Sequence, residues 1–71
     1  LVVYDRDGLP FLLLECKAPT VPLTRAVVEQ ALRYNLTLRA PYLAVSNGVA
    51  FFCGKISEGG VARVDDLPTI P

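Results

Sequence analysis

The chain is short and rich in apolar side chains, with 71 residues of which 52% are hydrophobic. Seven basic and seven acidic residues give a formal net charge of zero, so bulk charge does not indicate a nucleic-acid-binding module. The sequence contains no His, which excludes a Ser-His-Asp triad, a Cys-His pair and an imidazole metal site within it.

Length and hydropathy limit the class of protein further. A membrane span needs about 20 predominantly apolar residues, whereas the longest uncharged run, 40–54, is shorter and contains Pro and Gly. A core this small rarely supplies more than about 3–5 kcal/mol, and the chain begins at Leu1 without a Met. We therefore expect a part of one domain, 1–71, whose remaining sequence covers some of the apolar surface. Cys16 and Cys53 lie in apolar runs, which predicts two buried, reduced thiols of a cytoplasmic protein.

A β-hairpin and a helix are predicted for the first half of the chain. Residues 1–4 and Pro10–Cys16 have strand patterns, and the segment 5–8 is a dense turn signal. The apolar run of the second strand is continuous, which predicts burial on both faces, as at the centre of a sheet flanked by helices. After a linker with two prolines, a helix is expected from about Thr24, its N-cap, to about Arg39.

The two faces of this helix follow from side-chain spacing. Apolar and aromatic side chains recur on one face, at Val27, Ala31, Tyr34 and Leu38. The opposite face carries polar side chains, at Arg25, Glu29, Arg33 and Thr37. We expect the first face to pack on the sheet and the second to meet solvent.

A second hairpin is predicted for the remaining chain. Tyr42–Ser46 and 49–54 have strand patterns, and the Asn-Gly pair at 47–48 is a strong signal for a type I′ turn between them. The segment 58–60 has the composition of another turn and precedes a short fifth strand at 61–64.

These elements predict an α/β fold with a mixed sheet. A helix between two buried strands favours a right-handed crossover, which places Tyr42–Ser46 parallel to Pro10–Cys16. The expected order is hairpin, helix, hairpin and short fifth strand, with at least one helix covering the sheet.

Glu15 and Lys17 are the first candidates for chemistry. Two residues apart at the end of a buried strand, they are expected to project from the same face. A carboxylate there can hold a divalent cation, and a lysine can position a water or stabilise phosphate charge. The alternative is a strand end at which two charges are simply solvated, because this short pattern often arises by chance.

Gln30 and Tyr34 form a second constellation, because positions i and i+4 share a helix face. That face also carries core residues, and a Gln buried there needs hydrogen-bond partners. The alternative is a Tyr in the core with its hydroxyl at the rim and a Gln at the edge.

Four segments taken together, 1–8, 12–19, 30–35 and 41–48, make the sequence recognisable. In this order they resemble the N-terminal domain of type I restriction enzyme R subunits, in the PD-(D/E)xK nuclease superfamily. The likeness covers nearly the whole chain. It includes Glu15-Cys16-Lys17 and, at Gln30 and Tyr34, the QxxxY signature of RecB-like nucleases.

The resemblance implies a restriction-endonuclease-like core that hydrolyses DNA phosphodiesters with Mg²⁺. By motif match, Glu15 is a metal-binding carboxylate, Lys17 the catalytic lysine and the backbone carbonyl of Cys16 a further metal ligand. Gln30 and Tyr34 then support the site or its DNA contacts. In the family, this domain precedes an ATP-driven DNA translocase in one polypeptide, which works with modification and specificity subunits.

The family also needs an earlier Asp as a metal ligand, and neither Asp5 nor Asp7 suits that role. If the predicted hairpin closes, Glu15 lies opposite the position just before Leu1, and Asp5 is about 16 Å further along. We therefore expect the ligand just before Leu1, so that the domain is truncated at its N-terminus. A non-catalytic restriction-like fold that serves as a DNA-binding or assembly module is the alternative. The apolar excess disfavours a freestanding structural protein.

Overall fold

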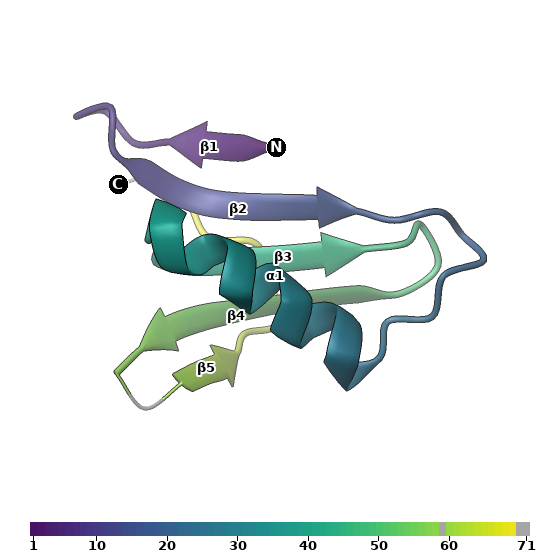
Figure 1. Ribbon diagram of the computed structural model, residues 1–71. Helices are drawn as coiled ribbons and strands as arrows, with labels where there is room; N and C mark the ends of the chain where they lie inside the picture. The colour runs from purple at the N-terminus through teal and green to yellow at the C-terminus, as the bar shows by residue number, and fades with distance from the viewer. Residues whose placement is uncertain (59, 70–71) are drawn as a thin grey trace.

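A five-stranded sheet with one helix on one of its faces is the architecture of the computed structural model, which describes residues 1–58 and 60–69 (Figure 1). The elements are β1 (Val2–Tyr4), β2 (Pro10–Cys16), α1 (Arg25–Leu38), β3 (Tyr42–Ser46), β4 (Phe51–Ser57) and β5 (Gly60–Arg63). Neighbouring strands follow the chain order, with β2 and β3 parallel and the other pairs antiparallel. The predicted α/β class, mixed sheet and fifth strand are confirmed.

The β1–β2 hairpin is closed by the side chain of Asp5. Its Oδ1 accepts hydrogen bonds from the amides of Asp7 at 2.9 Å and Leu9 at 3.0 Å, and Gly8 supplies a positive φ of 78°. A bulge follows in the ladder, so that Tyr4 pairs with Pro10 while Val3 pairs with Leu12 and Val2 with Leu13. The carboxylate of Asp5 therefore has a structural role in the turn.

Two hydrophobic clusters lie on the two faces of the sheet. The cluster beneath α1 consists of Leu13, Ala31, Ala40, Leu43 and Val45. The second cluster consists of Phe11, Leu12, Ala44 and Cys53, with Val64 packed against it. Figure 1 shows the chain after β5 passing behind the sheet, away from α1. The apolar run of β2 is thus buried on both faces as predicted, but on the far face the chain that follows β5, with Val64 against the second cluster, takes the place of a second helix in the described residues.

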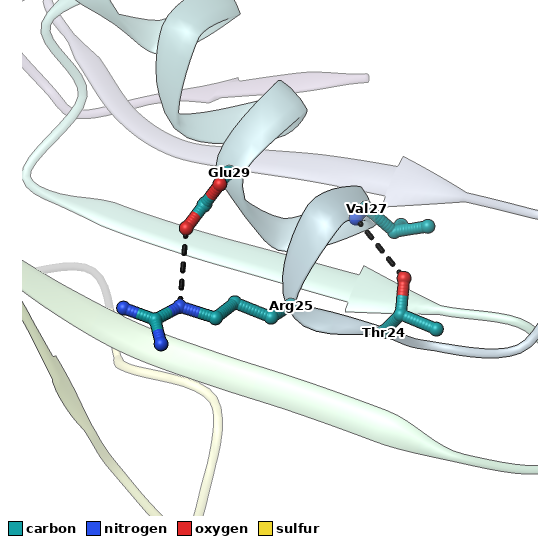
Figure 2. Close-up of polar contacts among 4 residues, drawn as sticks. All are labelled: Thr24, Arg25, Val27 and Glu29. Atoms are coloured by element: carbon teal, nitrogen blue, oxygen red, sulfur yellow. Dashed lines mark hydrogen bonds and ion pairs between the residues drawn. The ribbon is translucent and has the colours of Figure 1, made fainter.

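The helix begins and ends close to the predicted residues. Thr24 is its N-cap, and Oγ1 of Thr24 accepts a hydrogen bond from the amide of Val27 at 3.4 Å (Figure 2). One turn along the solvent side, Nε of Arg25 donates to Oε1 of Glu29 at 3.1 Å, which is an i,i+4 ion pair (Figure 2). At the other end Arg39 adopts a left-handed conformation, with φ of 60°, and terminates the helix.

The prediction that Tyr34 faces the core is wrong. Tyr34 is 65% exposed, whereas the adjacent helix residue Asn35 is 4% exposed. Asn35, rather than Tyr34, therefore lies on the buried side of α1. The polar side chain is tolerated there because both of its hydrogen-bonding groups are satisfied by one residue. Nδ2 of Asn35 donates to the carbonyl of Ala40 at 2.9 Å, and Oδ1 accepts from the amide of Ala40 at 3.1 Å.

The predicted type I′ turn between the third and fourth strands is also wrong. A type I′ turn requires positive φ at both central residues, and of the pair only Gly48 has one, at 83°. Ser46 pairs with Phe51, so the connection is a four-residue loop, 47–50, and β4 begins two residues later than expected. The buried side chain of Asn47 organises this loop instead, since its Oδ1 accepts hydrogen bonds from the amides of Val49 and Ala50.

The C-terminal part agrees approximately with expectation. The last strand is Gly60–Arg63 rather than 61–64, and the predicted turn at 58–60 includes residue 59, which lies outside the described residues. Just past β5, the amide of Val64 donates to the carbonyl of Cys53 at 2.8 Å. Within the part of the chain that the structure describes, no helix is long and apolar enough to cross a membrane.

Candidate functional site

Glu15 and Lys17 project from the same face at the end of β2. Oε2 of Glu15 lies 3.7 Å from Nζ of Lys17, and 29% and 31% of the two side chains are exposed. Strand alternation directs the side chain of Cys16, which lies between them in the sequence, to the opposite face. There it is exposed. The shared orientation predicted for Glu15 and Lys17 is confirmed, whereas the predicted burial of Cys16 is wrong because the far-face cluster ends before it.

A cavity of about 330 Å³ separates this end of β2 from α1. Its lining includes all four side chains that the sequence indicates as candidates for function. Three further side chains of the helix also line it. The lining residues are Glu15, Lys17, Val27, Gln30, Ala31, Arg33 and Tyr34. Val27 and Ala31 form an apolar floor, and the polar groups surround it. Two successive elements, β2 and α1, therefore contribute to one site.

Gln30 and Tyr34 occupy the exposed rim of this cavity. Both side chains are solvent-accessible, and neither forms part of the buried core. They lie on the same side as Glu15 and Lys17, which agrees with the expected clustering and not with a place on the outer face. Their position is suited to contact with a large ligand that approaches from solvent.

Arg33 is a site residue that helical spacing predicts to lie on the outer face. It lines the same cavity and also a second one, of about 550 Å³, formed with Pro10, Tyr34, Thr37 and Leu38. The spacing of positions 30, 33, 34 and 37 along one helical stripe is the signal that could have revealed it. No ion-pair partner of Arg33 is found among the described residues. Its charge is thus available to an anionic ligand.

The backbone around Cys16 is directed toward the line of β1. Leu14 exchanges hydrogen bonds with Leu1 through both its amide and its carbonyl. In an antiparallel pair, residues two apart point the same way, so the carbonyl of Cys16 faces the part of the sheet edge that would precede Leu1. Lys17 instead turns to β3, and its amide donates to the carbonyl of Ser46 at 2.7 Å.

The donor atoms in the site suit a hard cation but form an incomplete set. Residues 1–58 and 60–69 contain no group of three or more His, Cys, Asp or Glu that could hold a metal ion. Mg²⁺ is usually bound by one or two carboxylates together with waters and substrate phosphates. Glu15 and the carbonyl of Cys16 offer oxygen donors of this kind. Asp5 and Asp7 belong to the turn at the opposite end of β2, as the register requires.

Comparison with known proteins gives one family match, which covers the whole chain. A family model described as "Type I restriction enzyme R protein N terminus (HSDR_N)" matches residues 1–71. Neither the curated proteins nor the solved structures gave a match. The family match includes both walls of the cavity, the end of β2 and helix α1.

Proposed function

The chain belongs to the family of type I restriction enzyme R protein N termini, and on that premise we propose that it is the DNA-cleaving domain of such a protein. In the longer protein it hydrolyses DNA phosphodiesters with Mg²⁺ as cofactor. The observation that supports this most directly is the single cavity shared by Glu15, Lys17, Gln30 and Tyr34. A carboxylate, an ammonium group and an accessible rim are what a phosphodiester hydrolase needs on the protein side.

Glu15 and the carbonyl of Cys16 would hold the cation in this proposal. When bound, Mg²⁺ polarises the phosphate and lowers the pKa of a coordinated water. Glu15 supplies a full negative charge, and its partial burial limits competition from bulk water. The backbone direction at Cys16 brings a second oxygen to the same corner of the sheet, next to the position of the Asp that we expect before Leu1.

Lys17 acts on the phosphate and on the attacking water. Its ammonium group is a compact charge with three donors, and it lies 3.7 Å from Oε2 of Glu15, the carboxylate that would hold the cation. With DNA bound, it would donate to a nonbridging phosphate oxygen and stabilise negative charge that develops as the bond breaks. It also orients a water for attack on phosphorus.

The rim residues bind DNA. Tyr34 presents an exposed aromatic ring, and Gln30 presents an amide with both donors and an acceptor. Arg33 adds a planar cation that suits phosphate oxygens. Arg33 therefore gives this stripe of α1 one positive charge although the net charge of the chain is zero.

The family places the domain in a restriction complex. We propose the arrangement expected from the sequence, in which an ATP-driven translocase follows in the same polypeptide and modification and specificity subunits select the DNA. A cytoplasmic location stays a prediction. A non-catalytic DNA-binding or assembly module is the second candidate, and the single carboxylate in the described cavity favours it.

Substitution of Glu15 in the full-length protein distinguishes the two candidates. Glu15→Gln keeps the shape and removes the charge, and Glu29→Gln is the matched control because Glu29 pairs with Arg25 away from the cavity. If the domain is a nuclease, Glu15→Gln lowers Mg²⁺-dependent DNA cleavage by more than the roughly 10–100-fold loss that is typical of substitutions at residues that only support metal ligands. Lys17→Ala has a similar effect, and ATP hydrolysis persists in every variant. Full cleavage by Glu15→Gln would exclude the nuclease role for this domain and favour the non-catalytic DNA-binding or assembly module.

A further inference from the structure

Asn47 is the most heavily bonded buried polar side chain at the end of the sheet that carries the cavity. It is 6% exposed. Its Oδ1 accepts from the amides of Val49 at 2.9 Å and Ala50 at 2.6 Å, and its Nδ2 donates to the carbonyl of Val21 at 2.7 Å. The first two bonds are local to the β3–β4 loop. The third crosses to a segment 26 residues earlier in the sequence.

That segment, the linker (residues 17–24), connects the two walls of the cavity. It begins at Lys17, at the end of β2, and leads to the N-cap of α1. Most of its side chains are exposed, with Leu23 packing against the core beneath the helix. An exposed linker of this kind has little burial to fix its course, so its few hydrogen bonds help to fix where the helix begins relative to β2, in addition to the packing of the helix on the sheet.

Consecutive residues at the end of β3 hold the linker at two points. The carbonyl of Ser46 accepts from the amide of Lys17 at 2.7 Å, and Nδ2 of Asn47 holds the carbonyl of Val21. Between these points, the amide of Val21 donates to the carbonyl of Ala18 at 2.9 Å and closes a turn. Without the Asn47 bond, the linker beyond this turn would be tied to the sheet only through Leu23 and the helix itself.

We propose that Asn47 is a positioning residue for DNA cleavage, which locks the linker to the β3–β4 loop and so sets the helix stripe of Gln30 and Tyr34 over Glu15 and Lys17. The inference rests on the proposed function. Asn47 does not line the cavity, so it acts through the linker. Misplacement of a bound substrate by about 1 Å can lower a rate by about 100-fold, and displaced DNA contacts on α1 would misplace the DNA in this way.

An amide side chain makes both kinds of bond at once, through two different atoms. The oxygen organises the loop, and the nitrogen reaches the linker. An aspartate at this position would keep the acceptor for Val49 and Ala50 but would turn a second acceptor toward the carbonyl of Val21. Asn47→Asp is therefore expected to leave the loop formed and to release the linker.

Asn35 offers a matched control. It is the other buried Asn, and its Nδ2 donates to a carbonyl, that of Ala40, while Oδ1 accepts a backbone amide. Asn35→Asp removes the same type of bond and introduces the same charge, at the opposite end of α1. The two variants, with Glu15→Gln as the inactive reference, are compared in the full-length protein by single-turnover DNA cleavage, DNA affinity and thermal unfolding.

The expected result for Asn47→Asp is a fall of about 10–100-fold in the cleavage rate together with weaker DNA affinity, because the displaced stripe carries residues that bind DNA. Asn35→Asp should retain cleavage even if its unfolding temperature falls as much as that of Asn47→Asp. Should Asn47→Asp not fold, Asn47→Ser replaces it, since a serine keeps a weaker version of the loop bonds and is too short to reach Val21.

Each contrary outcome has a distinct meaning. Wild-type cleavage by Asn47→Asp or Asn47→Ser, together with an inactive Glu15→Gln, overturns the positioning role and leaves the proposed function intact. If the Asn47 and Asn35 variants lose cleavage equally, in proportion to the fall in their unfolding temperatures, Asn47 is a purely structural residue. That result also overturns the positioning role. Cleavage by Glu15→Gln itself removes the proposed function and the inference with it.

Discussion

Leu1 and Leu14 exchange backbone hydrogen bonds in both directions. The amide of Leu14 donates to the carbonyl of Leu1 at 2.8 Å, and the amino group of Leu1 donates to the carbonyl of Leu14 at 3.0 Å. One step further along the ladder, a residue before Leu1 would lie directly across from Glu15. Directly opposed residues have their Cβ atoms about 4.5–5.5 Å apart on one face, so two carboxylates at these positions could share a cation.

We therefore predict an acidic residue immediately before Leu1 in the full-length protein. Its replacement by the corresponding amide is expected to abolish DNA cleavage, because Glu15 alone holds the cation weakly. The measurement is Mg²⁺-dependent cleavage by that variant, with Asp7→Asn as control since Asp7 lies in the exposed turn at the other end of β2. Efficient cleavage by a parent protein that lacks a carboxylate there would contradict the prediction.

Tyr34 is predicted to affect DNA handling and not stability. Its ring is 65% exposed at the cavity rim, and substitutions at exposed positions usually change the free energy of unfolding by less than about 0.5 kcal/mol. A base stacked on an aromatic side chain contributes about 1–3 kcal/mol. Tyr34→Ala in the full-length protein should thus weaken DNA binding or cleavage about tenfold or more at an unchanged unfolding temperature.

Two further variants identify the part of Tyr34 that matters. Tyr34→Phe retains the ring and should retain activity if stacking dominates. Leu36→Ala is the control on the same helix, because Leu36 is 74% exposed and lies away from this cavity. Equal DNA affinity and cleavage in Tyr34→Ala and the wild type would restrict Tyr34 to a surface residue without a role in the site.

The sequence predicted the elements that depend on local pattern. The apolar run ending at Glu15 indicated a strand buried on both faces, and the intervening helix indicated the parallel pairing of β2 with β3; both are observed. Two of the errors arose where a side chain makes a hydrogen bond that the sequence pattern does not reveal. The Asn-Gly signal at 47–48 could not include the bond from Asn47 to Val21, and periodicity could not show that Ala40 satisfies Asn35.

The candidate site was predictable in part for the same reason. Strand alternation alone placed Glu15 and Lys17 on one face, and the helical interval joined Gln30 to Tyr34. Whether those two pairs meet depends on how the linker directs α1 across the sheet, which no local pattern specifies. Arg33 was missed because its helical spacing from Glu29 and Thr37 predicts the solvent face, whereas the structure places it at the cavity.

The two cysteines are predicted to differ in reactivity. Cys16 is exposed, whereas Cys53 is 1% exposed and its burial raises the pKa of its thiol. A thiol reagent at mildly alkaline pH should modify Cys16 in the folded protein and Cys53 only after unfolding, as followed by peptide mass spectrometry. Because the folded state keeps the Cys53 proton more tightly, its contribution to stability declines as pH rises above the thiol pKa of the unfolded chain. Faster labelling of Cys53 than of Cys16 would contradict the assignment.

The chain of residues 1–71 by itself is predicted not to cleave DNA, whereas the full-length protein cleaves it. Among the described residues, Glu15 is the one carboxylate that lines the cavity, and the side chain of Asp5 is held in the hairpin turn. Lys17 would still neutralise part of the phosphate charge, but a lysine without a firmly held cation does not activate the water. With a formal net charge of zero, the isolated chain also has little electrostatic affinity for a duplex.

Nicking of supercoiled plasmid in the presence of Mg²⁺ measures this directly, with the full-length protein as the positive control. Circular dichroism of the isolated chain establishes first whether the sheet and helix are formed, so that inactivity is not mistaken for unfolding. Nicking by the isolated chain that disappears in its Lys17→Ala variant would show that residues 1–71 already supply a complete site. In that case no ligand before Leu1 is needed, and Glu15 with the carbonyl of Cys16 must hold the cation together with water and the DNA phosphate alone.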